Sequence, residues 1–196
     1  MKLYTYIVTH DTGFSPNPFY GWCTLACCKP KIRNSCNIGD YIAGFSSSAR
    51  NHKLIYIMRV TEKITFSDYW KDYRFITKRP TQDKNWKYLG DNIYKPISNE
   101  NFEQQISMHK SSIFPSEIDK KHKNKDLSSK YVLISNDFIY FGKSAKTVPE
   151  KLQKIVGGRG HRCKFSNEVL ASFLNFFQQL KHEGSGFLDW PIDFPF

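Results

Sequence analysis

A Gly-Asp turn opens the run Ile38-Gly39-Asp40-Tyr41-Ile42-Ala43-Gly44, and Leu54-Ile55-Tyr56-Ile57-Met58-Arg59-Val60 follows it after a short polar interval. Both runs are rich in the β-branched and aromatic residues that favour strands, and Lys2 to Val8 has the same bias. These runs predict strands over Lys2–Val8, Asp40–Phe45 and Leu54–Val60. The front half of the chain is therefore expected to be mostly sheet.

The back half combines strands with helices. Tyr131–Ser135 and Phe138–Phe141 flank Asn136-Asp137, a pair that tolerates the positive φ of a tight turn and so predicts a hairpin. Thr147, Pro149 and Glu150 have the spacing of a capping box, which indicates a short helix ending at Gly157-Gly158. A longer helix is expected from the Ser166 cap to Gly184, because apolar residues recur there on one stripe.

The stretch from about residue 71 to residue 130 is polar and weakly patterned, which indicates a long insertion after the third strand. Short helices are expected only near Phe66–Trp70 and Asn101–Met108. Lys120–Lys130 is highly charged and weakly apolar, so we expect an exposed, mobile loop there.

Length and charge fit one basic domain. The chain has 196 residues, close to one typical folding unit, so a single domain over 1–196 is expected. Its 29 Lys and Arg against 18 Asp and Glu give a net charge of +11, which favours an anionic partner, with nucleic acid ahead of a membrane.

The sequence shows no long apolar run and no signal-like amino terminus. A cytoplasmic location, no membrane contact and reduced cysteines are therefore predicted.

The loop from Thr9 to Cys23 interleaves aromatic with polar side chains, the combination that holds an unstacked base. An equally simple interpretation is that its aromatic residues fold the loop onto the core. His10-Asp11 could serve in acid/base chemistry, although neighbouring strand residues point to opposite faces, so binding or loop ordering is favoured. The loop contributes these candidate base-binding residues: His10, Asp11, Thr12, Phe14, Asn17, Phe19 and Trp22.

Two basic segments are candidates for phosphate contact. Lys29, Lys31 and Arg33 alternate, which places their charges on one face if the segment is extended. The alternative is a strand edge kept charged against aggregation. The Gly-rich turn carrying Arg159, His161 and Arg162 can bring amides and guanidiniums to an anion, and residues 143–164 hold seven basic side chains against one acidic.

A metal site is not expected. The cysteines at 23, 27, 28 and 36, even with His161 and Cys163 added, lack the two close ligand pairs of a structural zinc site. Small buried thiols explain them better, a lone reactive cysteine is a further alternative, and no cofactor is predicted.

The Gly-Asp turn and the apolar strand that ends in Val60 resemble the barrel strands of PUA-like domains of the EVE and ASCH group. Across residues 1 to 164 the chain is more specifically similar to the nucleotide modification associated domain family, second type. The motifs that carry this similarity are Thr9 to Pro18, Cys23 to Ala26 with Lys29-Pro30, Gly90 to Tyr94, Tyr140 to Gly142 and Gly158 to His161.

The resemblance implies an α+β fold, a PUA-like small mixed β-barrel with flanking helices and the long polar insertion. It also implies bacterial or phage systems that make, read or defend hypermodified DNA bases. PUA-like domains resembling EVE hold an extruded base in an aromatic pocket beside a basic surface. In this chain Asp40, at the turn before the second strand, is expected to share that pocket with the Thr9–Cys23 loop.

The leading hypothesis is a module that binds nucleic acid, DNA with a modified, flipped base above all, in systems of base hypermodification or phage defence. An enzyme, a transferase or hydrolase acting on a modified nucleotide, is the alternative. Its candidate acids, bases and nucleophiles are His10, Asp11, Cys23, Asp40, Asp91 and His161. A protein-interaction module of a defence complex is a third hypothesis, which explains the charge less well.

Overall fold

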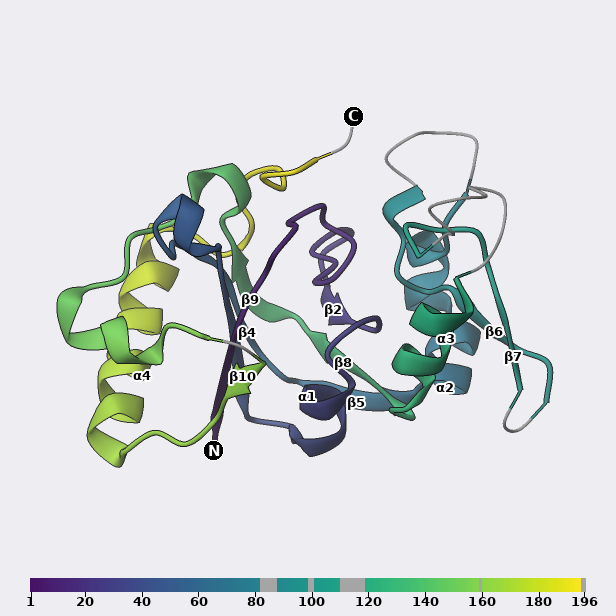
Figure 1. The fold of residues 1–196 in the computed structure, drawn as a ribbon, viewed down its shortest axis with the longest axis horizontal. Coiled ribbons are helices and arrows are strands. Elements are labelled where there is room, and N and C mark those ends of the chain that lie inside the picture. The colour runs from purple at the N-terminus through teal and green to yellow at the C-terminus, as the bar shows by residue number, and fades with distance from the viewer. Residues whose placement is uncertain (82–87, 99–100, 110–118, 159, 195–196) are drawn as a thin grey trace.

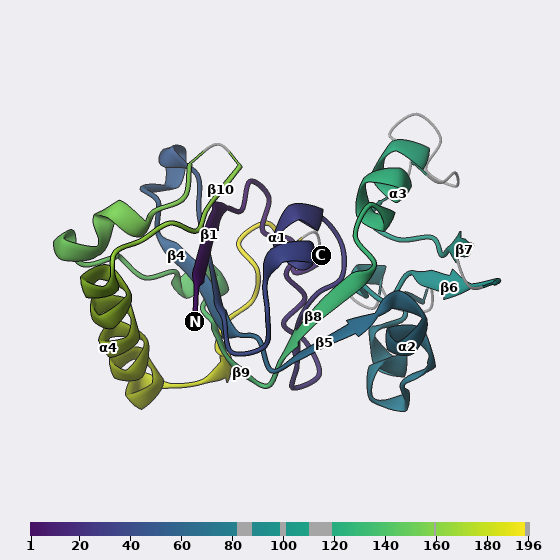
Figure 2. The same cartoon turned by 90° about the horizontal axis from the view of Figure 1, so that it is seen from below.

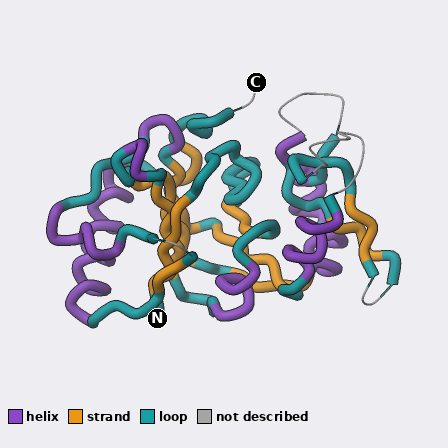
Figure 3. The backbone as a smooth tube through the Cα atoms, viewed as in Figure 1, coloured by secondary structure: helices purple, strands orange, loops and turns teal. Residues whose placement is uncertain are grey.

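Most of the strands lie in the middle of the protein with helices on either side, and one pair of strands lies at an outer edge (Figure 3). The computed structural model describes residues 1–81, 88–98, 101–109, 119–158 and 160–194 (Figure 1). The strands are β1 Leu3–Ile7, β2 Cys23–Leu25, β3 Tyr41–Phe45, β4 Leu54–Arg59, β5 Glu62–Thr65, β6 Tyr94–Pro96, β7 Phe102–Gln104, β8 Tyr131–Ser135, β9 Asp137–Tyr140, β10 His161–Arg162 and β11 Gly186–Phe187. The helices are α1 Pro30–Ser35, α2 Phe66–Lys71, α3 Lys120–Leu127 and α4 Asn167–Glu183, with 3-10 turns at Ser48–Arg50, Tyr73–Lys78, Gly142–Ser144 and Glu150–Ile155.

The strands form open sheets. The largest has the order β10-β1-β3-β4-β9-β11, with β1 parallel to β3 and β3 antiparallel to β4. A second sheet has the order β2-β8-β5, and β6 pairs with β7 alone. The α+β class is confirmed. Among the residues described, no sheet closes on itself, so the expected small PUA-like barrel is not found.

The large sheet is covered on both faces because its strands alternate. Tyr41, Ala43 and Phe45 belong to the core shared with α4, while Ile42 belongs to the core shared with the second sheet. Figure 2 shows α4 along one side of the large sheet and β8 with β5 on the other. Successive strand residues point to opposite faces, so one short run fills two cores.

Helix α4 confirms the expected cap and apolar stripe. The Ser166 side chain accepts a hydrogen bond from the Val169 N–H, and the helix ends at Glu183 before Gly184. Phe173 and Phe177 are fully buried against the large sheet. Each contributes roughly 1.5–3 kcal/mol by leaving water.

The hairpin expected at Asn136-Asp137 is wrong, although both of its strands exist. Strand β8 pairs with β2 and β5, whereas β9 pairs with β4 and β11, so the chain passes from one sheet into the other there (Figure 2). Both edges of β8 are already occupied. The Ser135 hydroxyl holds the bend by accepting the Asp137 N–H at 3.0 Å.

The described parts of the segment from residue 71 to residue 130 contain more helix and strand than the composition of the segment indicates. The α2 helix confirms the expected helix near Phe66–Trp70, but Phe102–Gln104 is a strand rather than a helix. Lys120–Leu127 is helical rather than a loop, because the Asp119 carboxylate accepts the backbone N–H groups of Lys121 and His122 at its start.

The extended conformation expected for Lys29 to Arg33 is also wrong. Pro30 begins helix α1, where a proline lacks only an N–H that the helix does not use. In a helix alternate residues do not share a face, so Lys31 is exposed while Arg33 is buried. None of the described helices is both long enough and apolar enough to cross a bilayer.

Candidate functional site

A cleft of about 780 Å³ opens where β1 ends. Its wall is built by the loop after β1, the turn into α1, the segment around His109, and the start of β10. Several residues expected in the site line it together: His10, Thr12, Phe14, Lys29, Lys31 and His161. Sequence positions far apart thus converge on one concave surface.

The turn into α1 carries unusual backbone geometry. Cys28 has a φ of 60° and Lys29 a φ of 41°, both in the left-handed region that non-glycine residues rarely adopt. The Lys29 ammonium lies 4.4 Å above the centre of the Tyr6 ring. Burial lowers the pKa of Lys29. The turn therefore presents a thiol and a partly desolvated cation to the cleft.

Other expected residues lie in the core, with their polar groups already used. The buried Asp11 carboxylate accepts the Tyr140 hydroxyl and the Ile192 N–H, and burial raises its pKa. Asn17 accepts the Lys78 ammonium at 2.6 Å and donates to the carbonyl oxygens of Gly13 and Leu89. These two side chains tie the loop to the rest of the protein and do not line the cleft.

The same holds for Asp40 and Asp91. Asp40 accepts the backbone N–H groups of Lys2 at 2.6 Å and Asn37 at 2.9 Å, so it holds its own turn closed. Asp91 accepts the hydroxyls of Thr24 and Tyr69 at 2.7 Å, and burial raises its pKa. The expectation that Asp40 shares the pocket is not met.

Three more of the expected residues pack against other side chains of the protein. Burial raises the pKa of the Cys23 thiol. Phe19 packs on Phe187 and Trp190, and Trp22 packs edge-on against Phe75. Arg33 donates to three backbone carbonyls rather than facing an anion. Arg159 lies outside the described residues.

A second concavity of about 620 Å³ adjoins the cleft through His161. It is lined on its basic side by Lys154, Arg162 and Lys164. Arg162 is exposed and donates to the Lys154 carbonyl at 3.2 Å. His161 lines both the cleft and the basic groove formed by these residues.

Two polar residues outside the predicted site, Cys28 and His109, line the cleft, and a third, Asp126, is buried behind them. The Cys28 Sγ is 3.5 Å from His109 Nε2, and His109 Nδ1 forms an ion pair with Asp126 Oδ2 at 2.9 Å. The sequence does not distinguish Cys28 from the other cysteines of its cluster, and His109 and Asp126 lie in the expected insertion. Only the fold brings them together.

The charges of this group stabilise one another. Burial favours neutral His109, but the Asp126 carboxylate and Cys28 outweigh it and raise the His109 pKa to about 9. Burial also opposes the charge on Asp126, yet His109 and Arg33 hold its pKa below the ordinary value. His109 is therefore protonated at neutral pH.

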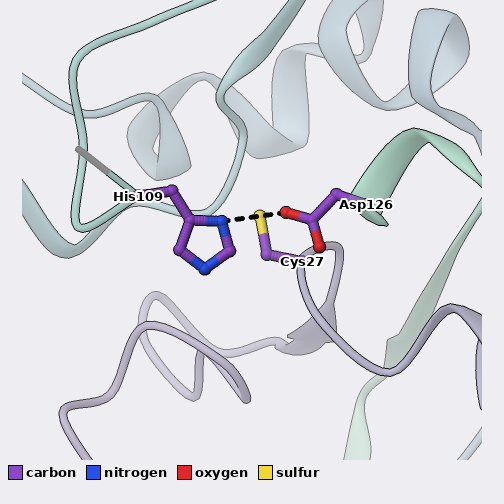
Figure 4. Close-up of side chains that lie close together, drawn as sticks. All are labelled: Cys27, His109 and Asp126. Carbon is purple, nitrogen blue, oxygen red and sulfur yellow. Dashed lines mark ion pairs between the residues drawn. The ribbon is translucent and has the colours of Figure 1, made fainter. Parts of the chain in front are cut away.

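A metal fits this place poorly. The ligand atoms of Cys27, His109 and Asp126 lie within 4.8 Å of one another, and Figure 4 shows His109 and Asp126 facing each other beside the Cys27 sulfur. Burial raises the Cys27 pKa well above its ordinary value, whereas metals bind the thiolate. Asp126 also lies 4.0 Å from the Arg33 guanidinium, a cation that would repel another.

The fold and the cleft define a basic α+β protein with aromatic and cationic groups around one concave site. A family model described as nucleotide modification associated domain 2 matches residues 1–195, so the chain belongs to the nucleotide modification associated domain 2 family. This membership links the protein to nucleotide modification. No curated protein and no solved structure matched the chain.

Proposed function

We propose that the cleft binds a nucleobase of a nucleic acid, with DNA carrying a modified base as the partner. The observation that carries this proposal is the convergence of aromatic rings and lysines in one cleft beside a basic groove. A volume of about 780 Å³ suits a nucleotide-sized ligand. We extend the proposal to a role in base hypermodification or phage defence because of the family membership.

The distribution of charge supports a polymer rather than a free base. Lys29, Lys31 and Lys125 line the cleft, and Lys154, Arg162 and Lys164 line the adjoining groove. A base in the cleft would leave its neighbouring phosphates near the groove, where cations neutralise them and release counterions.

His161 is the side chain best placed to stack on the base. It lines both concavities and is only half-buried. Burial, with the nearby charges of Lys31 and Lys29, lowers its pKa. The lowered pKa favours the neutral imidazole, which can stack without carrying a charge.

Replacing His161 with alanine should weaken binding of a single-stranded oligonucleotide about 5- to 150-fold, since base stacking is worth roughly 1–3 kcal/mol. Fluorescence anisotropy with oligonucleotides containing cytosine or 5-hydroxymethylcytosine measures this loss and any preference for the modified base. His182→Ala, on an exposed site of α4, is the matched control and should bind normally. Equal losses in both variants would contradict the assignment of the cleft.

Binding should also depend strongly on salt. Lys31→Ala and Arg162→Ala should each reduce the slope of log affinity against log salt by about 1, because each removes one phosphate contact. Titrations at several salt concentrations check this. An affinity indifferent to salt, or no binding at low salt, would remove nucleic acid as the partner.

A second candidate function is an enzyme acting on a modified nucleotide. The observation that favours it is the contact of Cys28 with His109 at the cleft. Of the catalytic candidates expected from the sequence, His10 and His161 also line the cleft, whereas Asp11, Cys23, Asp40 and Asp91 are buried.

A further inference from the structure

Cys28, His109 and Asp126 form a chain of polar contacts that ends in the cleft. The Cys28 Sγ lies 3.5 Å from His109 Nε2, and on the other side of the ring Nδ1 lies 2.9 Å from Asp126 Oδ2. Cys28 and His109 line the cleft, and Asp126 is buried behind them. A nucleophile, a protonated imidazole that can act as the acid, and a carboxylate that orients the imidazole occur here in that order.

The surrounding structure holds this arrangement in place. Asp126 Oδ1 accepts the Cys28 N–H at 2.6 Å, so the carboxylate fixes the nucleophile's backbone as well as the imidazole. Its other oxygen accepts the Tyr94 hydroxyl at 2.9 Å. The Phe14 ring packs edge-on against His109, with 4.8 Å between centroids, and restricts the rotation of the imidazole.

The strained backbone of Cys28 directs this residue, and not its neighbour Cys27, to the cleft. Its φ of 60° is followed by a φ of 41° at Lys29, and such residues cost free energy unless the rest of the fold compensates. The neighbouring Cys27 is fully buried, with its thiol directed to the Asp91 carbonyl. The left-handed turn separates the two thiols, so Cys28 alone of this pair reaches the cleft.

We infer that Cys28 is the nucleophile of an acyl-transfer reaction, in which the cleft hydrolyses an ester or amide that joins an acyl group to a nucleotide. This inference rests on the proposed function for the identity of the substrate, and on the Cys28–His109–Asp126 geometry for the chemistry. The cationic cleft would hold the nucleotide part, and the acyl carbonyl would lie against Cys28.

The reaction balances with water as the only co-reactant. After its thiol proton has passed to solvent, Cys28 attacks the carbonyl carbon and forms a C–S bond, and the C–O or C–N bond to the nucleotide breaks. The nucleotide leaves with the proton of His109 Nε2. Water then attacks the thioester and gives a proton to His109, and the carboxylic acid and the Cys28 thiolate are released.

The first test uses p-nitrophenyl acetate with the intact protein. We expect a burst of p-nitrophenolate stoichiometric with protein, and one added acetyl group that peptide mapping by mass spectrometry places on Cys28. Cys28→Ser should reduce the burst at least about 100-fold. Cys36→Ser, which removes a buried thiol that lines neither the cleft nor the basic groove, should keep it. A burst that survives Cys28→Ser would overturn the inference.

A second comparison tests the proton donor. In His109→Gln, the rate of hydrolysis of 2′(3′)-O-acetyl-AMP should fall much further than the rate of release of p-nitrophenolate. The ribose oxygen must be protonated as it leaves, whereas p-nitrophenolate leaves as a stable anion and needs no proton donor. A structural defect would lower both rates alike, so equal losses would overturn the assignment of His109 as the acid.

The outcomes separate this inference from the proposed function. Cys28→Ser should bind the oligonucleotide as tightly as the wild type while losing the burst. If the protein binds the oligonucleotide but forms no acyl-enzyme and does not hydrolyse the acetyl nucleotide, only this inference is overturned. If Cys28 is acylated but the protein neither binds the oligonucleotide nor hydrolyses the acetyl nucleotide, the nucleotide substrate and the proposed function are overturned. In that case Cys28 is still a nucleophile.

Discussion

Replacing Arg33 with alanine should lower the free energy of unfolding by about 3–5 kcal/mol, the cost of leaving buried charged and polar groups without their partner. Its guanidinium donates to the carbonyls of Cys28 at 2.9 Å, Tyr131 at 2.7 Å and Asp126 at 2.6 Å. The alanine variant leaves all three without this donor. Urea unfolding followed by circular dichroism measures the change in midpoint.

The matched variant is Lys31→Ala, two residues away on the exposed side of α1, which should unfold within about 0.5 kcal/mol of the wild type. Arg33→Lys should recover only part of the loss, because one ammonium cannot replace the planar fork of donors. If Arg33→Ala instead unfolded normally and bound nucleic acid more weakly, Arg33 would be a phosphate contact after all.

The strands could be predicted because their residues carry the pattern locally. In Tyr41–Phe45 and Leu54–Arg59, β-branched and aromatic side chains define each strand within a few residues. The pairing of the strands could not be predicted in the same way. The short link at Asn136 resembles a hairpin turn, but β8 pairs on its two edges with β2 and β5, which come from distant parts of the chain.

The loop after β1 could be found from its aromatic and polar composition, but the roles of its members could not be separated. Asn17 and Asp11 are residue types that could hydrogen-bond a base, and the same types cap turns and bind buried cations. The difference between His10, which lines the cleft, and Asp11, which is buried, depends on the strap near Ile192 that donates to Asp11.

The positions of His109 and Asp126 near Cys28 could not be predicted from the sequence, for a physical reason. They lie 81 and 98 residues from Cys28, in a segment without periodicity. Asp126 comes near because its helix, α3, packs against α1. A highly charged segment is ordinarily a solvated loop. Here one of its acids, Asp126, is instead buried beside Arg33 and orders the segment.

Raising the pH from about 6.5 to 9 should destabilise the protein through His109. Its pKa is about 9 in the folded state against an ordinary value of 6.5, because the attraction of Asp126 and Cys28 outweighs burial. The folded state therefore holds this proton more tightly than the unfolded state. The contribution of this proton to the free energy of unfolding is fully present below pH 6.5, decreases between pH 6.5 and pH 9, and is lost above pH 9. A pKa shift of this size corresponds to about 3 kcal/mol of stability.

The comparison with His109→Gln isolates this effect, since the variant has no proton to lose at this position. The groups around His109 are Asp126, Cys28 and His122, whose ring is stacked at 4.6 Å. Burial lowers the pKa of Lys78 to about 8, which raises stability with pH above that value, but it does so equally in both proteins. The wild-type advantage measured by urea unfolding should therefore shrink steadily from pH 6.5 to pH 9. An advantage that is constant with pH would mean that His109 is neutral in the folded protein, and that its contact with Asp126 is a hydrogen bond between an uncharged ring and a carboxylate.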